Sequence, residues 1–173
     1  MKKPGIPELV DPYKMCEKEL TLEGVILAKA LPRYADQLAG GATDSDQVEA
    51  SARFRRDEQG SRVAYIVYST LARLTCQRCL GEVGLKINGE TTFAFLGSES
   101  ELDQLPRSYE PVLMEGSEVN LLQAIEDELL LSLPMFAYHE DEHCSGELNE
   151  IKGQASETKA DNPFSVLGDL LKK

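Results

Sequence analysis

The residues of this chain that can do chemistry are cysteines and histidines, gathered in two short segments. Cys76-Gln-Arg-Cys79 has the C-x-x-C spacing with which two thiolates bind one metal ion. A later segment, His139-Glu-Asp-Glu-His143-Cys144, offers three further donors. Thiolate and imidazole are ligands that Zn²⁺ prefers, usually four in a tetrahedron. The two segments together therefore predict a Zn²⁺ site.

Cys76, Cys79 and Cys144 are the thiolate ligands that we expect at this site. For the fourth ligand we favour His139 over His143. His143 is adjacent to Cys144, and adjacent residues point in different directions and rarely bind one tetrahedral ion. The choice between the two histidines stays open at this point.

A closed, structural metal site is expected rather than a catalytic one. A catalytic zinc keeps an open position and needs a general base, and no H-E-x-x-H helix is present. A zinc-dependent hydrolase is kept as an alternative, with Glu140 or Glu142 as its base.

The cysteines also bear on location and redox chemistry. The chain has four of them, without an apolar leader or a long apolar run, so we expect a cytoplasmic protein with no membrane contact and no disulfides. Unreactive buried thiols and a redox pair are the competing interpretations of C-x-x-C. Thioredoxin-like chemistry is disfavoured because Cys76 lies between two expected strands and not at a helix N-terminus. We expect Cys16 to be an ordinary buried thiol.

Charge is distributed unevenly along the chain. The formal net charge of −12 argues against a protein that simply coats RNA. Residues 51–90 nevertheless contain seven basic residues against four acids, and residues 91–150 contain fourteen acids against Arg107 alone. A solvated acidic surface explains this equally well as a basic face for RNA beside an acidic face for a basic partner. The candidate RNA-binding residues are Arg53, Arg55, Arg56, Arg73 and Arg78.

The elements that must position these residues can be predicted from pattern and capping. Strands are expected where β-forming residues alternate or run together, at 19–28, 47–57, 62–75 and 82–96. Helices are expected after Asp11-Pro12, from Pro32 to Leu38, and from Asn120 to Leu133. Asn88-Gly89 is expected to be a turn or a bulge, and 97–118 is expected to be irregular.

These elements predict an α+β fold. An antiparallel sheet carries C-x-x-C at a hairpin tip, and the helix after Asn120 packs on it. We expect one domain over 1–144, a polar linker over 145–161 and an amphipathic C-terminal helix over 162–173.

Several motifs occur in an order that resembles one bacterial family. They are Leu9-Val-Asp-Pro12, Cys76-Gln-Arg-Cys79-Leu80, Leu105-Pro-Arg-Ser-Tyr-Glu-Pro111, the segment from Asn120 to Pro134, the 139–144 cluster, and Asn162-Pro-Phe-Ser-Val-Leu167. This combination is similar to the YceD family, the large ribosomal RNA subunit accumulation proteins. The resemblance also implies that His139 is a ligand, because family members with more cysteines have a cysteine at this position.

The resemblance implies a non-enzymatic role in ribosome biogenesis, supporting the accumulation or processing of large-subunit (23S) rRNA. The implied partners are that rRNA or a pre-ribosomal particle, and a basic ribosomal protein, with no small-molecule substrate. The alternative is a protein-only adaptor that binds a basic ribosomal protein or a nuclease through its acidic segment or its C-terminal helix.

Overall fold

The computed structural model describes residues 5–114 and 116–145. The expected helix at 162–173, and the expected linker beyond its first residue, lie outside these ranges. The chain divides into two compact units, Met1–Tyr138 and His139–Lys173, and the fold below is that of the first. No helix in the described part is long and apolar enough to cross a membrane.

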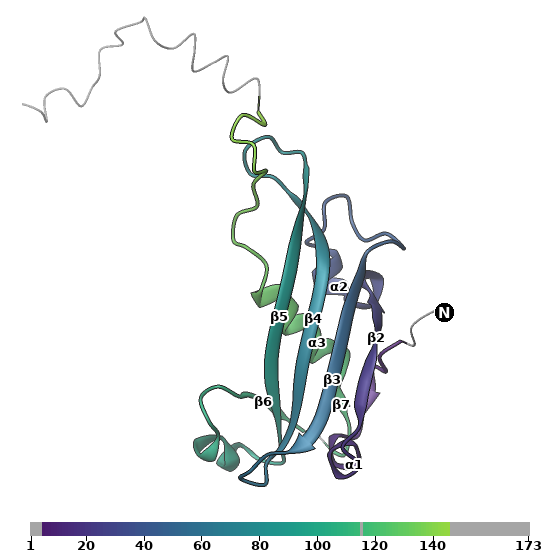
Figure 1. The fold of residues 1–173 in the computed structure, drawn as a ribbon, viewed down its shortest axis with the longest axis vertical. Coiled ribbons are helices and arrows are strands. Elements are labelled where there is room, and N and C mark those ends of the chain that lie inside the picture. The colour runs from purple at the N-terminus through teal and green to yellow at the C-terminus, as the bar shows by residue number, and fades with distance from the viewer. Residues whose placement is uncertain (1–4, 115, 146–173) are drawn as a thin grey trace, which may run out of the picture. The chain divides into compact units, whose positions relative to one another are not determined.

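A five-stranded sheet is the centre of the first unit, in the order β2-β3-β4-β5-β6 (Figure 1). Its strands are β2 (Thr21–Leu27), β3 (Gln47–Arg56), β4 (Arg62–Thr75), β5 (Glu82–Leu96) and β6 (Glu110–Leu113). The first four pair antiparallel, and β6 pairs parallel to β5. A small second sheet joins β1 (Leu9–Val10) to β7 (Val119–Asn120). The expected α+β fold is confirmed, with a mixed sheet.

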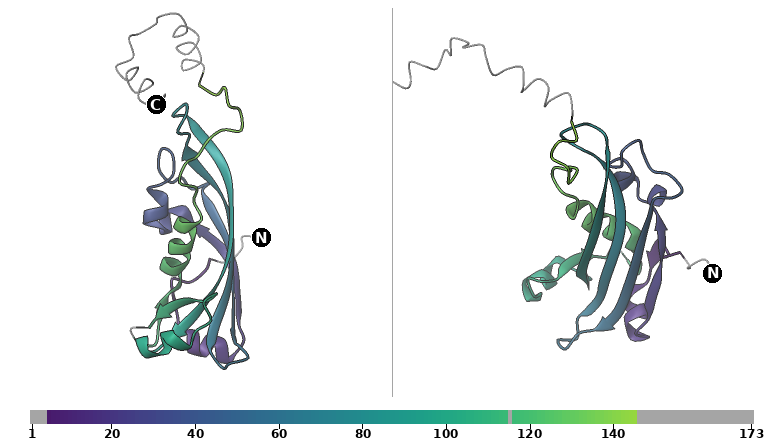
Figure 2. Two further views of the ribbon diagram at one scale, coloured as in Figure 1. Left: turned by 90° about the vertical axis from the view of Figure 1, so that its left-hand side faces the viewer. Right: turned by 45° about the horizontal axis from the view of Figure 1, so that its top comes forward.

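The helices of this unit gather on one face of the sheet (Figure 2). The α-helices are α1 (Pro12–Glu17), α2 (Pro32–Ala35) and α3 (Leu121–Leu131), and the 3₁₀ turns are η1 (Ala28–Ala30) and η2 (Glu99–Gln104). Two expected N-caps are present. The side chain of Asp11 accepts from Lys14 N at 3.0 Å, and that of Asn120 accepts from Gln123 N at 2.9 Å.

Two expectations about local structure were wrong. The stretch 97–118 is not wholly irregular, because it contains η2 and β6. Strand β6 is a short edge strand that includes Pro111, so it shows no alternation that a sequence pattern could reveal. Asn88-Gly89 is neither a turn nor a bulge, because β5 runs through it and both residues pair one to one with Ser69 and Tyr68 of β4.

Only a glycine fits at position 89, because the Tyr68 ring occupies the space that a side chain would need. A Cβ on Gly89 would lie 2.2 Å from the Tyr68 ring. The ring continues to α3, where its hydroxyl donates to Glu128 O at 3.0 Å and lies 2.6 Å from Ser132 Oγ. This close approach links the sheet to the C-terminal end of α3.

A buried carboxylate joins α2 to α3. Glu126 is 3% exposed and accepts from the backbone N–H groups of Arg33 and Tyr34 at 2.8 and 3.1 Å. The Arg33 guanidinium completes the contact at 2.8 Å and also binds the exposed Asp127. Glu126 therefore satisfies N–H groups at the start of α2 and balances its own charge.

A second buried carboxylate fixes the loop between α2 and β3. Asp46, 7% exposed, pairs with Arg73 of β4 through two contacts of 2.8 Å and also accepts from Thr43. The Arg73 guanidinium further donates to the carbonyls of Ala39 and Gly41. Hydrogen bonds from Arg73 are the main reason that the pKa of Asp46 lies well below its usual range.

We predict that Glu126→Ala lowers the free energy of unfolding by about 2–4 kcal/mol, because it leaves buried N–H groups and Arg33 without their acceptor. Asp127→Ala removes the exposed neighbour of the same charge and should cost less than about 1 kcal/mol. Urea denaturation of both variants measures the difference. Equal losses of stability would contradict the role assigned to Glu126.

We predict that Asp46 makes the protein sensitive to acid. A carboxylate whose folded pKa is depressed stabilises the fold above its unfolded pKa, and this contribution is lost as pH falls. The unfolding free energy of the wild type should therefore fall more steeply between about pH 5 and about pH 2 than that of Asp46→Asn. At neutral pH this variant should already be less stable by about 3 kcal/mol, because Arg73 loses its partner.

The exposed Asp44→Asn, close by in the same loop, is the matched control at neutral pH and should change stability by less than about 1 kcal/mol. Denaturation curves across this pH range make the comparison. Parallel pH profiles for the wild type and Asp46→Asn would show that the pair does not contribute in this way.

Candidate metal centre and basic surface

The C-x-x-C segment lies at the tip of the β4–β5 hairpin, as the sequence predicted. Cys76 N donates to Gly81 O at 2.8 Å and Leu80 N donates to Cys76 O at 2.9 Å, which closes a tight loop. Leu80 has a φ of 60°, a left-handed conformation uncommon for a residue with a side chain. Arg78 N points at Cys76 Sγ at 3.4 Å. The loop backbone therefore directs an N–H group at the sulfur atom of Cys76.

The chain after α3 returns to this hairpin tip. Gln77 N donates to Ala137 O at 2.8 Å, and Ala137 is buried. The Arg78 guanidinium lies over the Tyr138 ring at 5.3 Å, within the range of a cation–π contact. These contacts fix the residue that directly precedes His139. Sequence reasoning missed these contacts, because a hydrogen bond to the Ala137 carbonyl has no signature in the sequence.

Four potential ligands form one group. One donor atom from each of Cys76, Cys79, His139 and Cys144 lies within 4.8 Å of the other three. His143 is not in this group, and its backbone N–H donates to Asp141. Cys76 is buried and the other three are partly exposed.

The donor chemistry of this group fits a structural metal ion. Three thiolates and one imidazole are a common set for tetrahedral Zn²⁺. Four protein donors leave no coordination position for water or substrate, which is the arrangement of a closed site. The group could therefore bind a metal ion, and the identity of that ion and its ligand set stay predictions.

Cys16 is separate from this group, as expected. It is 2% exposed on α1, and its thiol points at Val63 O at 3.6 Å. Burial raises the pKa of this thiol above its ordinary value, which disfavours the reactive thiolate. Cys16 is a buried apolar contact between α1 and β4.

The five candidate arginines do not form one surface. Arg53, Arg55 and Arg56 are exposed at the end of β3 nearest the β3–β4 turn. Arg78 lies at the opposite end of β4, beside the metal-ligand candidates. Arg73 forms ion pairs with Asp46 and Glu82. We call the set Arg53, Arg55 and Arg56 the arginine end.

The arginine end holds cationic groups that have no ion pair among the described residues. Arg53 and Arg55 share a face of the sheet, as strand alternation requires, and Tyr65 and Val63 lie opposite them on β4. Arg62 is adjacent and stacks over the Tyr13 ring at 4.0 Å. This end of the sheet is suited to anionic groups.

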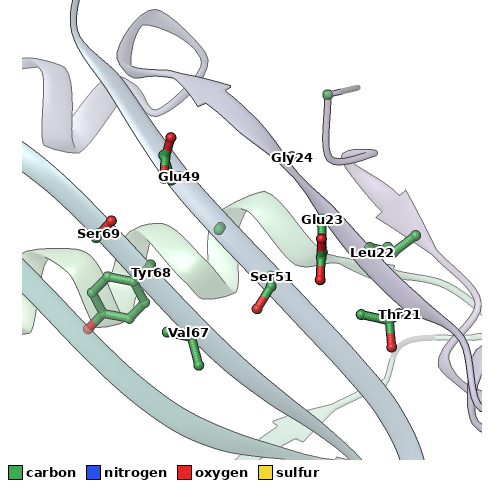
Figure 3. A pocket seen from close by; sticks show the side chains of 11 residues that line it. Thr21, Leu22, Glu23, Gly24, Glu49, Ser51, Val67, Tyr68 and Ser69 are labelled. Carbon is green, nitrogen blue, oxygen red and sulfur yellow. The ribbon is translucent and has the colours of Figure 1, made fainter. Parts of the chain in front are cut away.

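The middle of the outer sheet face is acidic instead. A hollow of about 690 Å³ opens there over β2, β3 and β4, and Figure 3 shows Glu23 and Glu49 among the small side chains that line it. Glu90 lies on the same face, opposite Val67. The basic face expected along the strands is thus confined to the arginine end, since these carboxylates repel phosphate.

Comparisons with known proteins agree on one family. Residues 66–171 match the family model described as "Large ribosomal RNA subunit accumulation protein YceD". A Haemophilus influenzae protein, "Large ribosomal RNA subunit accumulation protein YceD", is 32% identical over 177 residues that cover 100% of both chains. No solved structure matches this chain.

Proposed function

Because the chain belongs to the YceD family of large ribosomal RNA subunit accumulation proteins, we propose that it supports the accumulation of large-subunit (23S) rRNA as a non-enzymatic assembly factor. The observation that carries this proposal is the match over the full length of the chain to a relative with that name. The family resemblance inferred from the motifs is thereby confirmed.

A role without catalysis is supported by the chemistry of the metal-ligand group. Four protein ligands would occupy every position of a tetrahedral ion and exclude a metal-bound water. The carboxylates beside it, at 140–142, are exposed to solvent. A zinc hydrolase therefore has less support than an assembly factor.

Direct contact with rRNA through the arginine end is the mechanism that we propose. Arginine binds phosphate oxygens with its planar fork of donors, and exposed guanidinium groups without carboxylate partners need give up no ion pair to do so. Tyr65 lies across from Arg53 and is 38% exposed, so an unpaired base could stack beside the phosphate contacts. Arg73 has a structural role in this proposal, and Arg78 a supporting role at the hairpin tip.

Zinc is the metal that we propose for the group of Cys76, Cys79, His139 and Cys144. The ion would hold the hairpin tip in the conformation that its backbone hydrogen bonds already favour. Its contribution would be stability, since binding free energy at such sites is also folding free energy.

We predict that the double reversal Arg53→Glu, Arg55→Glu weakens binding to large-subunit precursor particles and to isolated 23S rRNA. Removing two phosphate-binding side chains should reduce the slope of log affinity against log salt by about 1.4–1.8, at about 0.7–0.9 for each. Filter binding at several salt concentrations and co-sedimentation with particles are the measurements.

The matched control is Lys29→Glu, Lys86→Glu, which changes the net charge equally at exposed positions away from the arginine end. It should retain most of the wild-type affinity and the full salt slope. If the two double variants bind alike, the arginine end is not the RNA contact. If both retain full binding to the particles, a protein contact explains that binding instead.

We predict that the purified, reduced protein contains stoichiometric zinc and that Cys79→Ser or Cys144→Ser abolishes it. Both variants should also unfold at lower denaturant concentration, and a chelator should lower the stability of the wild type toward theirs. Cys16→Ser is the control and should keep its metal, because Cys16 lies outside the ligand group. Full zinc content in Cys144→Ser would exclude the proposed ligand set.

A further inference from the structure

The end of α3 carries large apolar side chains that are exposed. Leu131 is 80% exposed, Met135 is 90% exposed and Phe136 is 61% exposed. All three lie within one short segment, in which α3 ends at Leu131 and Pro134 follows. We call Leu131, Met135 and Phe136 the α3-end surface. Isolated exposed apolar residues are ordinary, but three so close together indicate a contact surface.

These side chains are not part of the core. The buried face of α3 consists of Leu121, Ile125 and Leu129, which recur every four residues. Leu131 lies two residues beyond Leu129 and so points about 200° away from it around the helix. The fold does not need an apolar residue at Leu131, Met135 or Phe136, and exposing three of them has a cost in solubility.

The surroundings of this surface are acidic. Helix α3 has no basic residue in its last turn, where the partial negative charge of the helix end favours a cation. Glu128 lies there instead, and Asp127, which precedes it, is paired with Arg33. Burial raises the pKa of the Glu128 carboxyl above its ordinary value, and the negative charges of Glu110 and Asp127 raise it further. Anionic groups from two elements therefore act on Glu128, in the last turn of the helix that carries Leu131.

We propose that the α3-end surface is a docking site for a basic, amphipathic segment of a partner protein. Apolar side chains of that segment cover Leu131, Met135 and Phe136, and its Lys or Arg side chains meet Glu128 and the helix end. The flexible thioether of Met135 suits a surface that adapts to its partner. This inference is independent of the arginine end and holds whether or not the chain contacts RNA.

Charge complementarity selects this occupant over the others. The same carboxylates repel the phosphates of nucleic acid and the head groups of anionic lipid. A second copy of the chain is also disfavoured, because a two-fold contact would bring Glu128 near its own counterpart in a chain of net charge −12.

The test uses the full-length protein and a synthetic helical peptide with leucine at every third or fourth position and lysine elsewhere. Two control peptides have the same composition in scrambled order, and glutamate in place of lysine. The wild type should bind the basic amphipathic peptide, more weakly as salt rises, and should bind neither control to a comparable degree. Fluorescence anisotropy of a labelled peptide measures this.

The variants Leu131→Ser, Met135→Ser and Glu128→Gln locate the site. The two serine variants together should weaken binding by about tenfold or more, as truncation of central apolar residues does at small interfaces. Glu128→Gln should reduce both affinity and its salt dependence. The matched control is Leu9→Ser, Leu71→Ser, which removes apolar residues that are 56% and 63% exposed elsewhere and should bind as the wild type.

Three results would overturn the proposal: equal binding by the α3-end variants and the control variant, equal binding of the acidic peptide, or no binding by the wild type. Self-association of the wild type that Leu131→Ser, Met135→Ser abolishes, measured by sedimentation velocity, would assign the surface to a second copy and also overturn it. Unchanged thermal unfolding of each variant is required for the comparison.

Discussion

The register between β4 and β5 is the constraint on which the rest of this structure depends. Every pair from Val63↔Ala94 to Thr75↔Glu82 is antiparallel, so one register decides which side chains face the helices. A shift of one residue would remove Gly89 from under the Tyr68 ring, and with it the hydrogen bonds from Tyr68 to α3. The same register ends at Thr75↔Glu82, so Cys76 and Cys79 lie together at the hairpin tip.

Two buried carboxylates then fix the helices and the loop that lie outside the β4–β5 pair. Glu126 connects α3 to the start of α2, and Asp46 connects the loop after α2 back to Arg73 of β4. Both are acceptors for several donors, which is the condition under which a buried charge stabilises a fold. Together they fix α2 and the loop after it, in addition to the core packing of the buried Leu31, Tyr34 and Leu38. This explains why Asp46 and Glu126 are buried, although acidic residues in the sequence resemble a solvated surface.

The elements that the sequence predicts correctly are those with a local cause. Alternation of apolar residues identifies β3, a run of β-forming residues identifies β4, and the caps at Asp11 and Asn120 locate the starts of α1 and α3. Strand β6 could not be predicted, because its parallel pairing with β5 depends on a partner distant in sequence and its own four residues have no pattern. The roles of Arg73 and Glu126 were equally hidden, since charge alone does not distinguish a buried ion pair from a solvated residue. Spacing predicted the C-x-x-C hairpin tip, but not the Gln77–Ala137 hydrogen bond that brings the chain after α3 back to it.

Separation of charge along the fold gives the two proposed contacts different chemistry. Arg53, Arg55 and Arg56 follow the end of β3, while the acidic residues gather on the outer sheet face and around the end of α3. A single basic ligand or a single anionic ligand could not satisfy both surfaces. An assembly factor, however, meets RNA and basic protein in the same particle, and surfaces of opposite charge let it bind each while repelling the other. The net charge of −12 argued against an RNA-coating protein, but it is consistent with a protein that binds RNA and basic protein at a junction between the two.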